Sequence, residues 1–290
     1  MENPDLVLVH GDTTTSFTAA LAAFYQKTPV GHVEAGLRTY DKYSPYPEEM
    51  NRSLTSRIAE LHFCPTEGNK ANLLLENINS NVFVTGNTVI DAFQTTVKPD
   101  YQFKNEKLRN IDIKSTKCVL ITAHRRENIG QPLVNICRAI TSLAQKYKEL
   151  TFVYPVHLNP AVQEIVREEL ANISNVYLIE PLDVEDMHNI ISQSYFVITD
   201  SGGLQEEAPA FGIPVLVVRS ETERPEAVKA GTVKVVGTNT QDIIAHAVSL
   251  IEDSETYEAM AKATNPYGDG HASERIMNAI LRWYFNDQKN

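Results

Sequence analysis

The stretch YFVITDSGGLQEEAPAFGIPVLVV, residues 195–218, combines an apolar strand, a Gly-rich turn, a short helical segment and a second apolar strand. Strands that read as continuous runs of Val, Ile and Leu are buried on both faces, which is typical of parallel sheets covered by helices. Two such strands joined through a helix make one unit of a doubly wound fold. The stretch therefore predicts an α/β protein.

The same alternation continues on both sides of this stretch. Segments with apolar residues at helical spacing, such as 159–171 and 240–252, separate further apolar strands. The strand candidates are 5–10, 29–33, 61–65, 81–86, 118–123, 152–157, 176–180, 195–200, 214–218 and 232–237. The pattern predicts a doubly wound fold nearly from end to end.

A polar segment divides the series of strands. Residues 98–116, KPDYQFKNEKLRNIDIKST, have no sustained periodicity and predict a linker. Residues 117–268 hold enough strand candidates for a complete Rossmann-like domain, whereas residues 1–97 hold fewer and predict a remnant of such a domain. The amphipathic helix expected at 272–285 is predicted to pack back on the first block.

Composition restricts the class of protein. The net charge of −11 argues against a nucleic-acid surface, which would be basic. The chain has no run of about eighteen apolar residues that would predict a membrane-spanning helix, and its first residues do not resemble a secretory leader. Cys64, Cys118 and Cys137 form no metal or disulfide motif and are expected to be buried thiols. These observations predict a cytoplasmic protein.

Polar side chains follow several of the predicted strands. They are Asp12, Glu34, His124, His157, Asp200 and Ser201. Ligands of open parallel sheets bind at the carboxyl ends of the strands. Any one of these residues could instead be a helix N-cap or a turn former, but the set together favours a binding site.

The Gly-rich turn predicts an anion site. Gly202 and Gly203 let the backbone approach a ligand closely, and the start of the following helix attracts negative charge. Glu206 and Glu207, in the first turns of that helix, could accept hydrogen bonds from ribose hydroxyls. The alternative is a Gly-rich turn with acidic residues that merely complement the helix dipole.

Charged groups elsewhere add to this pattern. Glu48 and Arg52 are spaced i, i+4 on a helix predicted to open at Pro47, and the alternative to a functional role is a surface ion pair. The long aromatic loop before that helix favours function. Arg125 and Arg126 suit a phosphate or carboxylate.

Nine motifs in order carry a family resemblance. HGDTTTS, HVEAGLRT, PEEMNR, TGNTVIDA, TAHRREN, YPVHLNP, TDSGGLQEEAP, TERPEA and NPYGDG make the chain, from residue 4 to about 283, resemble the bacterial non-hydrolysing UDP-N-acetylglucosamine (UDP-GlcNAc) 2-epimerases. The resemblance implies two Rossmann-like domains in a GT-B arrangement, with the active site in the cleft. It also implies interconversion of UDP-GlcNAc and UDP-ManNAc through elimination of UDP, giving 2-acetamidoglucal, and its re-addition. No nicotinamide, other cofactor or metal is implied.

The resemblance assigns roles in the reaction. Asp12, Glu34 and Glu48 are implied to be the catalytic carboxylates, with Arg52 supporting them. His124 is implied to face the diphosphate. Which carboxylate acts as acid and which as base stays open.

The resemblance also assigns binding roles. Ser201 and Gly202 are implied to bind phosphate, Glu207 the ribose, and Arg224 to lie in the UDP pocket, although Arg224 could simply face solvent at a helix start. Arg126 and His157 resemble part of a site for a second, activating UDP-GlcNAc. A homodimer and a role in supplying ManNAc for cell-surface polysaccharide are further expectations.

One departure from the family leaves alternatives. The family begins with a strand and a Gly-Thr-Arg-Pro-Glu loop that grips phosphates, and neither is in this sequence, so we expect an N-terminally truncated first domain. The alternatives to an active epimerase are a UDP-sugar-binding fragment without turnover, a hydrolysing epimerase and a GT-B glycosyltransferase.

Overall fold

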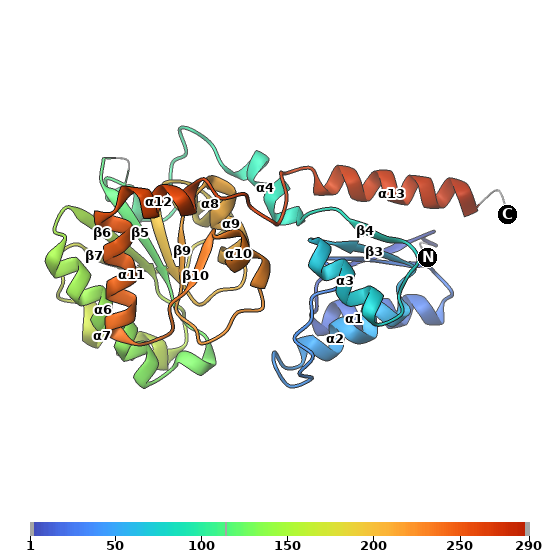
Figure 1. The fold of residues 1–290 in the computed structure, drawn as a ribbon, viewed down its shortest axis with the longest axis horizontal. Helices are drawn as coiled ribbons and strands as arrows, with labels where there is room; N and C mark the ends of the chain where they lie inside the picture. Colours follow the sequence, from blue (N-terminus) through green and yellow to red (C-terminus); the bar gives the residue numbers. More distant parts are fainter. Residues whose placement is uncertain (1–2, 114, 288–290) are drawn as a thin grey trace. The chain divides into compact units, whose positions relative to one another are not determined.

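The computed structural model describes residues 3–113 and 115–287. The chain forms two compact units (Figure 1): unit 1 runs to Ala92 and resumes at Pro266, and unit 2 spans Phe93–Asn265. Each unit holds a parallel sheet with helices against it. The predicted α/β class with parallel sheets is therefore confirmed.

Unit 1 contains a four-stranded sheet in the order β1-β2-β3-β4. The strands are β1 (Val7–His10), β2 (Val30–Val33), β3 (Leu61–Cys64) and β4 (Val82–Val84). The helices are α1 (Thr14–Tyr25), α2 (Glu48–Ile58), α3 (Glu67–Leu75), the first part of α4 (Thr88–Thr96) and α13 (Ala272–Asp287).

Apolar residues cover both faces of this sheet. Alternate strand residues point to opposite faces, so Val9 and Val30 pack with Ala20 of α1 on one face. On the other face Phe63 packs with Ile276 of α13. The C-terminal helix therefore completes the core of unit 1.

Unit 2 contains a six-stranded parallel sheet in the order β10-β9-β8-β5-β6-β7. The strands are β5 (Lys117–Thr122), β6 (Leu150–Pro155), β7 (Val176–Ile179), β8 (Ser194–Thr199), β9 (Val215–Val217) and β10 (Val233–Val235). The helical elements are α5 (Glu106–Arg109), η1 (Arg126–Asn128), α6 (Gln131–Lys146), α7 (Pro160–Leu170), α8 (Val184–Ser192), α9 (Leu204–Glu207), η2 (Ala208–Phe211), α10 (Pro225–Ala230), α11 (Thr240–Glu252) and α12 (Ser254–Ala261).

The central strands of unit 2 are buried on both faces, as their apolar runs predict. Helices lie on each side of the sheet, with α6, α7 and α11 on one side and α8, α9 and α10 on the other (Figure 1). Val119 and Ile121 of β5 pack in one cluster with Ile136 and Ile140 of α6. Residues four apart share one face of a helix, so α6 presents a continuous apolar stripe to the sheet.

The segment 98–116, predicted as a linker, belongs to unit 2 in the structure. The buried Asp186 carboxylate of α8 accepts hydrogen bonds from the Tyr101 hydroxyl at 2.8 Å and from the backbone N–H groups of Lys104 and Asn105 at 2.9 and 2.8 Å. One buried carboxylate of α8 therefore holds this segment on unit 2 through one side-chain and two backbone hydrogen bonds.

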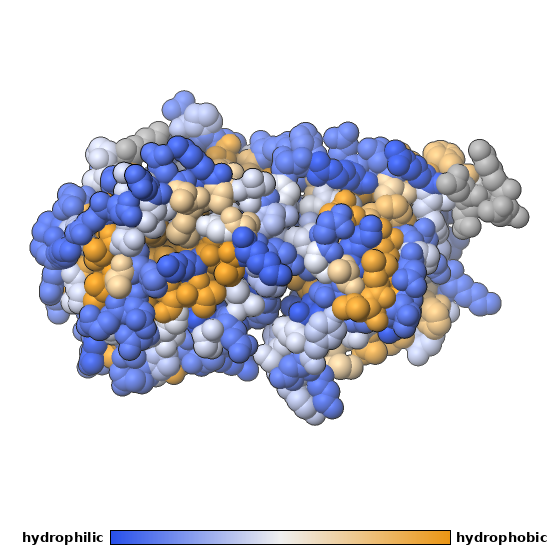
Figure 2. Space-filling view, viewed as in Figure 1, coloured by the Kyte–Doolittle hydropathy of each residue, from blue (hydrophilic) through white to orange (hydrophobic). Residues whose placement is uncertain are grey.

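Hydrophilic side chains cover much of the viewed surface, with apolar areas on both units (Figure 2). No helix in the described part of the chain has the length and apolar character needed to cross a bilayer. Cys64, Cys118 and Cys137 are buried free thiols, as predicted.

Candidate active site

The sheet of unit 2 reverses its order between β5 and β8. These two strands are hydrogen-bonded neighbours, and the chain adds β6 and β7 on one side and β9 and β10 on the other. Ligands of open α/β sheets bind outside the carboxyl ends of the strands at such a point. Thr122 and Thr199 are register partners at the ends of β5 and β8, so the predicted residues that follow them, His124 and Ser201, lie on neighbouring loops.

A buried carboxylate organises the loop after β5. Oδ2 of Asp200, which is 0 % exposed, accepts the backbone N–H groups of His124 and Arg125, both at 2.8 Å, and Nδ2 of Asn128 at 3.0 Å. Its Oδ1 has no hydrogen-bond partner among the described residues and lies 3.9 Å from Nδ1 of His124. Sequence reasoning marked Asp200 as a strand-end group but missed this organising role.

Two guanidinium groups flank the buried Gly202. A β-carbon placed on Gly202 would lie 3.5 Å from Nη2 of Arg125 and 3.8 Å from Nη2 of Arg224. The missing side chain therefore leaves a position that faces two positive charges. Such a position suits a phosphate, because guanidinium groups bind phosphate oxygens through charge-assisted hydrogen bonds.

Carboxylates hold both arginines in place. Nε of Arg224 is paired with Glu206, which is 3 % exposed. Nη1 of Arg125 lies 3.4 Å from Glu223, which also accepts a hydrogen bond from Arg219 at 2.9 Å. Burial raises the pKa of Glu223, but the Arg219 hydrogen bond and the charges of Arg219, Arg125 and Arg224 outweigh it and bring the pKa down to about 2.

The helix after the Gly-rich turn is a single turn, shorter than the helix of several turns that the sequence predicts. α9 spans Leu204–Glu207 and passes directly into the 3-10 turn η2, which has a proline at its start. A single helical turn has a small dipole, because the dipole is a sum over aligned peptide units. The positive potential at Gly202 therefore comes mainly from Arg125 and Arg224.

Glu207 lies beside this position. A β-carbon on Gly203 would be 2.9 Å from its Oε1, so its carboxylate lies over the Gly-rich turn. On the other side, Nε2 of His188 is 3.9 Å from Oε2. Burial, with the charge of Glu206 as a smaller cause, raises the pKa of Glu207 from 4.5 to about 7.

His157 contacts His124 in the structure, whereas the Arg126 side chain contacts neither ring. The two imidazole rings stack with centroids 4.9 Å apart and an interplanar angle of 7°. Burial is the main cause that lowers the pKa of His124, opposed by Asp200 and assisted by His157 and Arg125. The Arg126 side chain, on η1, is exposed and forms no hydrogen bond or ion pair with the residues that the structure describes.

In unit 1, the side chains of Asp12 and Arg52 form an ion pair. Oδ2 of Asp12 accepts a hydrogen bond from Nε of Arg52 at 2.9 Å and lies 2.7 Å from Nη2 in an ion pair. Nη1 of Arg52 donates to Glu49 at 3.0 Å. Arg52 is 6 % exposed, so this is a buried network and not the surface ion pair considered as the alternative.

The ion pair of Glu48 with Arg52, considered as the alternative to a functional role, does not form. Glu48 is the first residue of α2 and is half-buried, with no hydrogen bond or ion pair to Arg52; the partner is Glu49, one residue later. Pro47 is the N-cap of α2 and precedes its first turn. Glu34 follows β2 with a φ of 64°, and its Oε2 lies 3.5 Å from Nε2 of His10.

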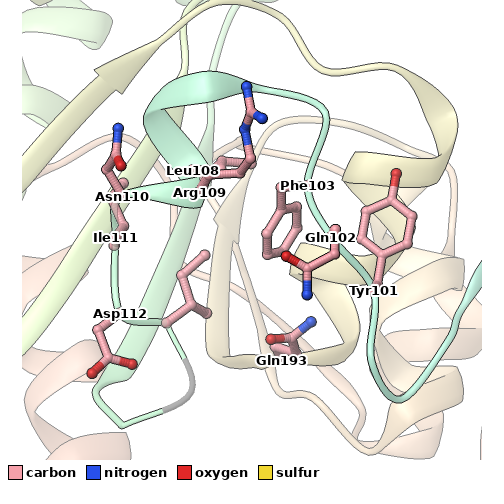
Figure 3. A pocket seen from close by; sticks show the side chains of 10 residues that line it. Tyr101, Gln102, Phe103, Leu108, Arg109, Asn110, Ile111, Asp112 and Gln193 are labelled. Carbon is pink, nitrogen blue, oxygen red and sulfur yellow. The ribbon is translucent and has the colours of Figure 1, made fainter.

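A cavity elsewhere in unit 2 contains none of the predicted site residues. It has a volume of about 390 Å³ and is lined by residues 101–103, residues 108–113 and Gln193 (Figure 3). Its side chains are aromatic, aliphatic and amide groups together with one cation, Arg109, and one carboxylate, Asp112.

Comparison with known proteins agrees with this geometry. Residues 1–281 match the family described as UDP-N-acetylglucosamine 2-epimerase. The chain belongs to the UDP-N-acetylglucosamine 2-epimerase family. A curated member of the family, from Bacillus subtilis, is 52% identical over 282 residues, which are 97% of this chain and 73% of that protein.

Solved structures of the epimerase family resemble this chain closely. The S. aureus MnaA structure with UDP is 54% identical with a TM-score of 0.91, over 98% of this chain and 76% of that one. The Neisseria meningitidis epimerase bound to UDP-GlcNAc is 53% identical with a TM-score of 0.86, over 96% of this chain and 76% of that one.

Proposed function

We propose that this chain interconverts UDP-GlcNAc and UDP-ManNAc. The observation that carries the proposal is the position at Gly202, which faces the guanidinium groups of Arg125 and Arg224 beside the carboxyl ends of β5 and β8. An anionic diphosphate fits the charge of that position. The chain belongs to the epimerase family, and structures of relatives have been solved with UDP and with UDP-GlcNAc. This supports the proposal that the diphosphate at this position is part of a sugar nucleotide.

Unit 2 is proposed to hold the UDP moiety. Ser201 and Gly202 would contact phosphate, and Arg125 and Arg224 would supply positive charge. Glu207 would accept hydrogen bonds from the ribose hydroxyls. His124 would face the diphosphate, on the loop that Asp200 fixes. These groups stabilise the negative charge that grows on UDP as it departs.

Unit 1 is proposed to transfer protons to and from C2 of the sugar. A base removes the proton from C2 of the sugar, the C1–O bond breaks, and UDP leaves with the bonding electrons to give 2-acetamidoglucal. The C1–O bond then forms again while an acid returns a proton to the opposite face of C2. Asp12, Glu34 and Glu48 are the candidate acids and bases, and Arg52 orients Asp12 through a hydrogen bond from Nε and an ion-pair contact from Nη2.

The remaining expectations are part of the same proposal. Arg126 and His157 would bind a second, activating UDP-GlcNAc, which the stacking of His157 on His124 supports by linking that site to the diphosphate site. The enzyme would act in the cytoplasm as a homodimer and supply ManNAc for a cell-surface polysaccharide.

The test is to incubate the chain with UDP-GlcNAc in D₂O and follow the reaction by proton NMR. We expect UDP-ManNAc to appear and deuterium to replace the C2 proton of both sugars, because the proposed base exchanges its proton with solvent. UDP binding without turnover would indicate a binding fragment. Release of free ManNAc would indicate a hydrolysing enzyme, and transfer of the sugar to an acceptor would indicate a glycosyltransferase.

A further inference from the structure

Glu49 has both carboxylate oxygens engaged in the interior of unit 1. Its side chain is on α2, and the residue is 4 % exposed. Oε1 accepts the backbone N–H of Tyr40 at 3.0 Å, and Oε2 accepts Nη1 of Arg52 at 3.0 Å. One buried carboxylate thus joins a loop to a guanidinium group.

The guanidinium group continues the connection to Asp12. Nε of Arg52 donates to Oδ2 of Asp12, and Nη2 lies 2.7 Å from the same oxygen. Nδ2 of Asn51 donates to the Asp12 backbone oxygen at 2.9 Å. A guanidinium group is planar and its donors have fixed directions. Fixing Nη1 at Glu49 therefore fixes the plane in which Nε and Nη2 meet Asp12.

The other end of the connection is the loop of residues 39–47. Tyr40 has a φ of 64°, in the left-handed region that residues with a β-carbon adopt only when their surroundings hold them there. The bond from its N–H to Glu49 and the bond from its hydroxyl to Asn72 at 3.0 Å supply that restraint. The loop carries the exposed rings of Tyr40, Tyr43 and Tyr46.

We propose that Glu49 is a positioning residue for Asp12. It sets the orientation of Arg52, through which it holds the Asp12 carboxylate, and it ties that carboxylate to the aromatic loop 39–47. This inference rests on the proposed function, in which Asp12 transfers a proton. Glu48, its neighbour in the sequence, has no part in this connection.

The first part of the test needs no turnover. The Nε–H signal of Arg52, assigned with Arg52→Lys, is recorded by ¹⁵N-correlated NMR in the unaltered chain, in Glu49→Gln and in Glu76→Gln. Glu76 is the matched control, because it pairs with Arg38 at 2.6 Å in the same unit and has no direct bond to Arg52 or Asp12. We expect Glu49→Gln to shift the Arg52 signal and to speed hydrogen exchange of the Tyr40 amide, and Glu76→Gln to leave both unchanged. An unmoved Arg52 signal in Glu49→Gln would overturn the proposal.

The second part measures catalysis. Glu49→Gln should lower kcat at least about tenfold with KM changed less than about threefold, since the proposed UDP ligands are in unit 2. In an Asp12→Asn background the same substitution should have no further effect, because Glu49 acts through Asp12. Additive losses would show a general structural role and overturn the proposal. If the unaltered chain binds UDP but has no turnover, the proposed function fails, and the NMR comparison still decides whether Glu49 positions Arg52.

Discussion

Asp200 accepts the backbone N–H of His124 at 2.8 Å, which ties the end of β8 to the loop after β5. The same oxygen accepts the N–H of Arg125, so one buried carboxylate holds the backbone of both residues, and the guanidinium group of Arg125 lies near Gly202. A charged acceptor forms stronger hydrogen bonds than a neutral one. The anion position therefore depends on a residue that does not itself face the ligand.

Asp200→Asn should weaken UDP binding at least about tenfold, because bonds to a charged group contribute about 1.5–3 kcal/mol each and an amide weakens all of those that Oδ2 accepts. Calorimetry with UDP measures the change. Asp112→Asn is the control, since that exposed carboxylate of unit 2 bonds to Ser115. Unchanged affinity in Asp200→Asn would contradict the role of Asp200 in holding the loop.

UDP binding should depend on pH through Glu207. Its pKa is raised to about 7, so most of the carboxyl is protonated at pH 6 and most is ionised at pH 8. If the ionised form binds the ribose hydroxyls, affinity should rise about tenfold between these values. Glu207→Gln should remove this part of the profile and leave the part due to titration of the UDP phosphate. Identical profiles for the two proteins would exclude Glu207 as the ribose ligand.

The sequence was sufficient for the fold class because the strands of both sheets are continuous apolar runs. The helices expected at 159–171 and 240–252 are α7 and α11. The pairing order β10-β9-β8-β5-β6-β7 did not follow from the sequence, since it depends on contacts between distant segments. Pro209 could have predicted that the helix after Gly203 ends early, because proline has no backbone N–H to continue a helix.

The candidate site was less accessible to sequence reasoning. Helical spacing allows Arg52 to meet either Glu48 or Glu49, and the choice depends on which side of α2 faces the sheet. The roles of Asp200, Glu206 and Glu49 come from burial and from partners far away in the chain. The assigned roles of Asp12, Glu34 and Glu48, like the GT-B arrangement of the two units, stay predictions.

Asp12→Asn should lower kcat at least about a hundredfold, the scale of a lost general acid or base. UDP affinity should change less than about twofold, since the proposed nucleotide ligands belong to unit 2. Initial rates and calorimetry on the same preparation measure both quantities. A variant with near-normal kcat would show that Asp12 is not a proton-transfer group.

Unit 1 should lose stability in mild acid. Burial is the main cause that lowers the pKa values of His32 and His62, register partners on β2 and β3, from 6.5 to about 4. Between these values the unfolded chain binds more protons than the folded chain, so stability is lost as the pH falls from 6.5 to 4. The loss is on the order of 3 kcal/mol for each histidine.

Fluorescence of Trp283, the single tryptophan of the chain, can follow this acid unfolding because its ring packs on the core of unit 1. His62→Leu should flatten the dependence of unfolding on pH. His271→Gln, at an exposed histidine, should not. An unfolding free energy in the unaltered chain that stays constant from pH 6.5 to 4 would contradict the assignment of neutral buried histidines.

Gly202→Ala and Gly203→Ala should separate phosphate binding from ribose binding. The added methyl at residue 202 meets no atom closer than 3.5 Å, so the fold should keep its Tm, but the methyl occupies the position that faces Arg125 and Arg224. At residue 203 the methyl would lie 2.9 Å from Oε1 of Glu207 and should displace that carboxylate.

Calorimetry with pyrophosphate and with uridine distinguishes the two effects. Gly202→Ala should weaken pyrophosphate binding at least about tenfold and leave uridine binding nearly unchanged, whereas Gly203→Ala should do the reverse. If Gly202→Ala binds pyrophosphate normally, the anion does not lie at this glycine and the proposed placement of the diphosphate is wrong.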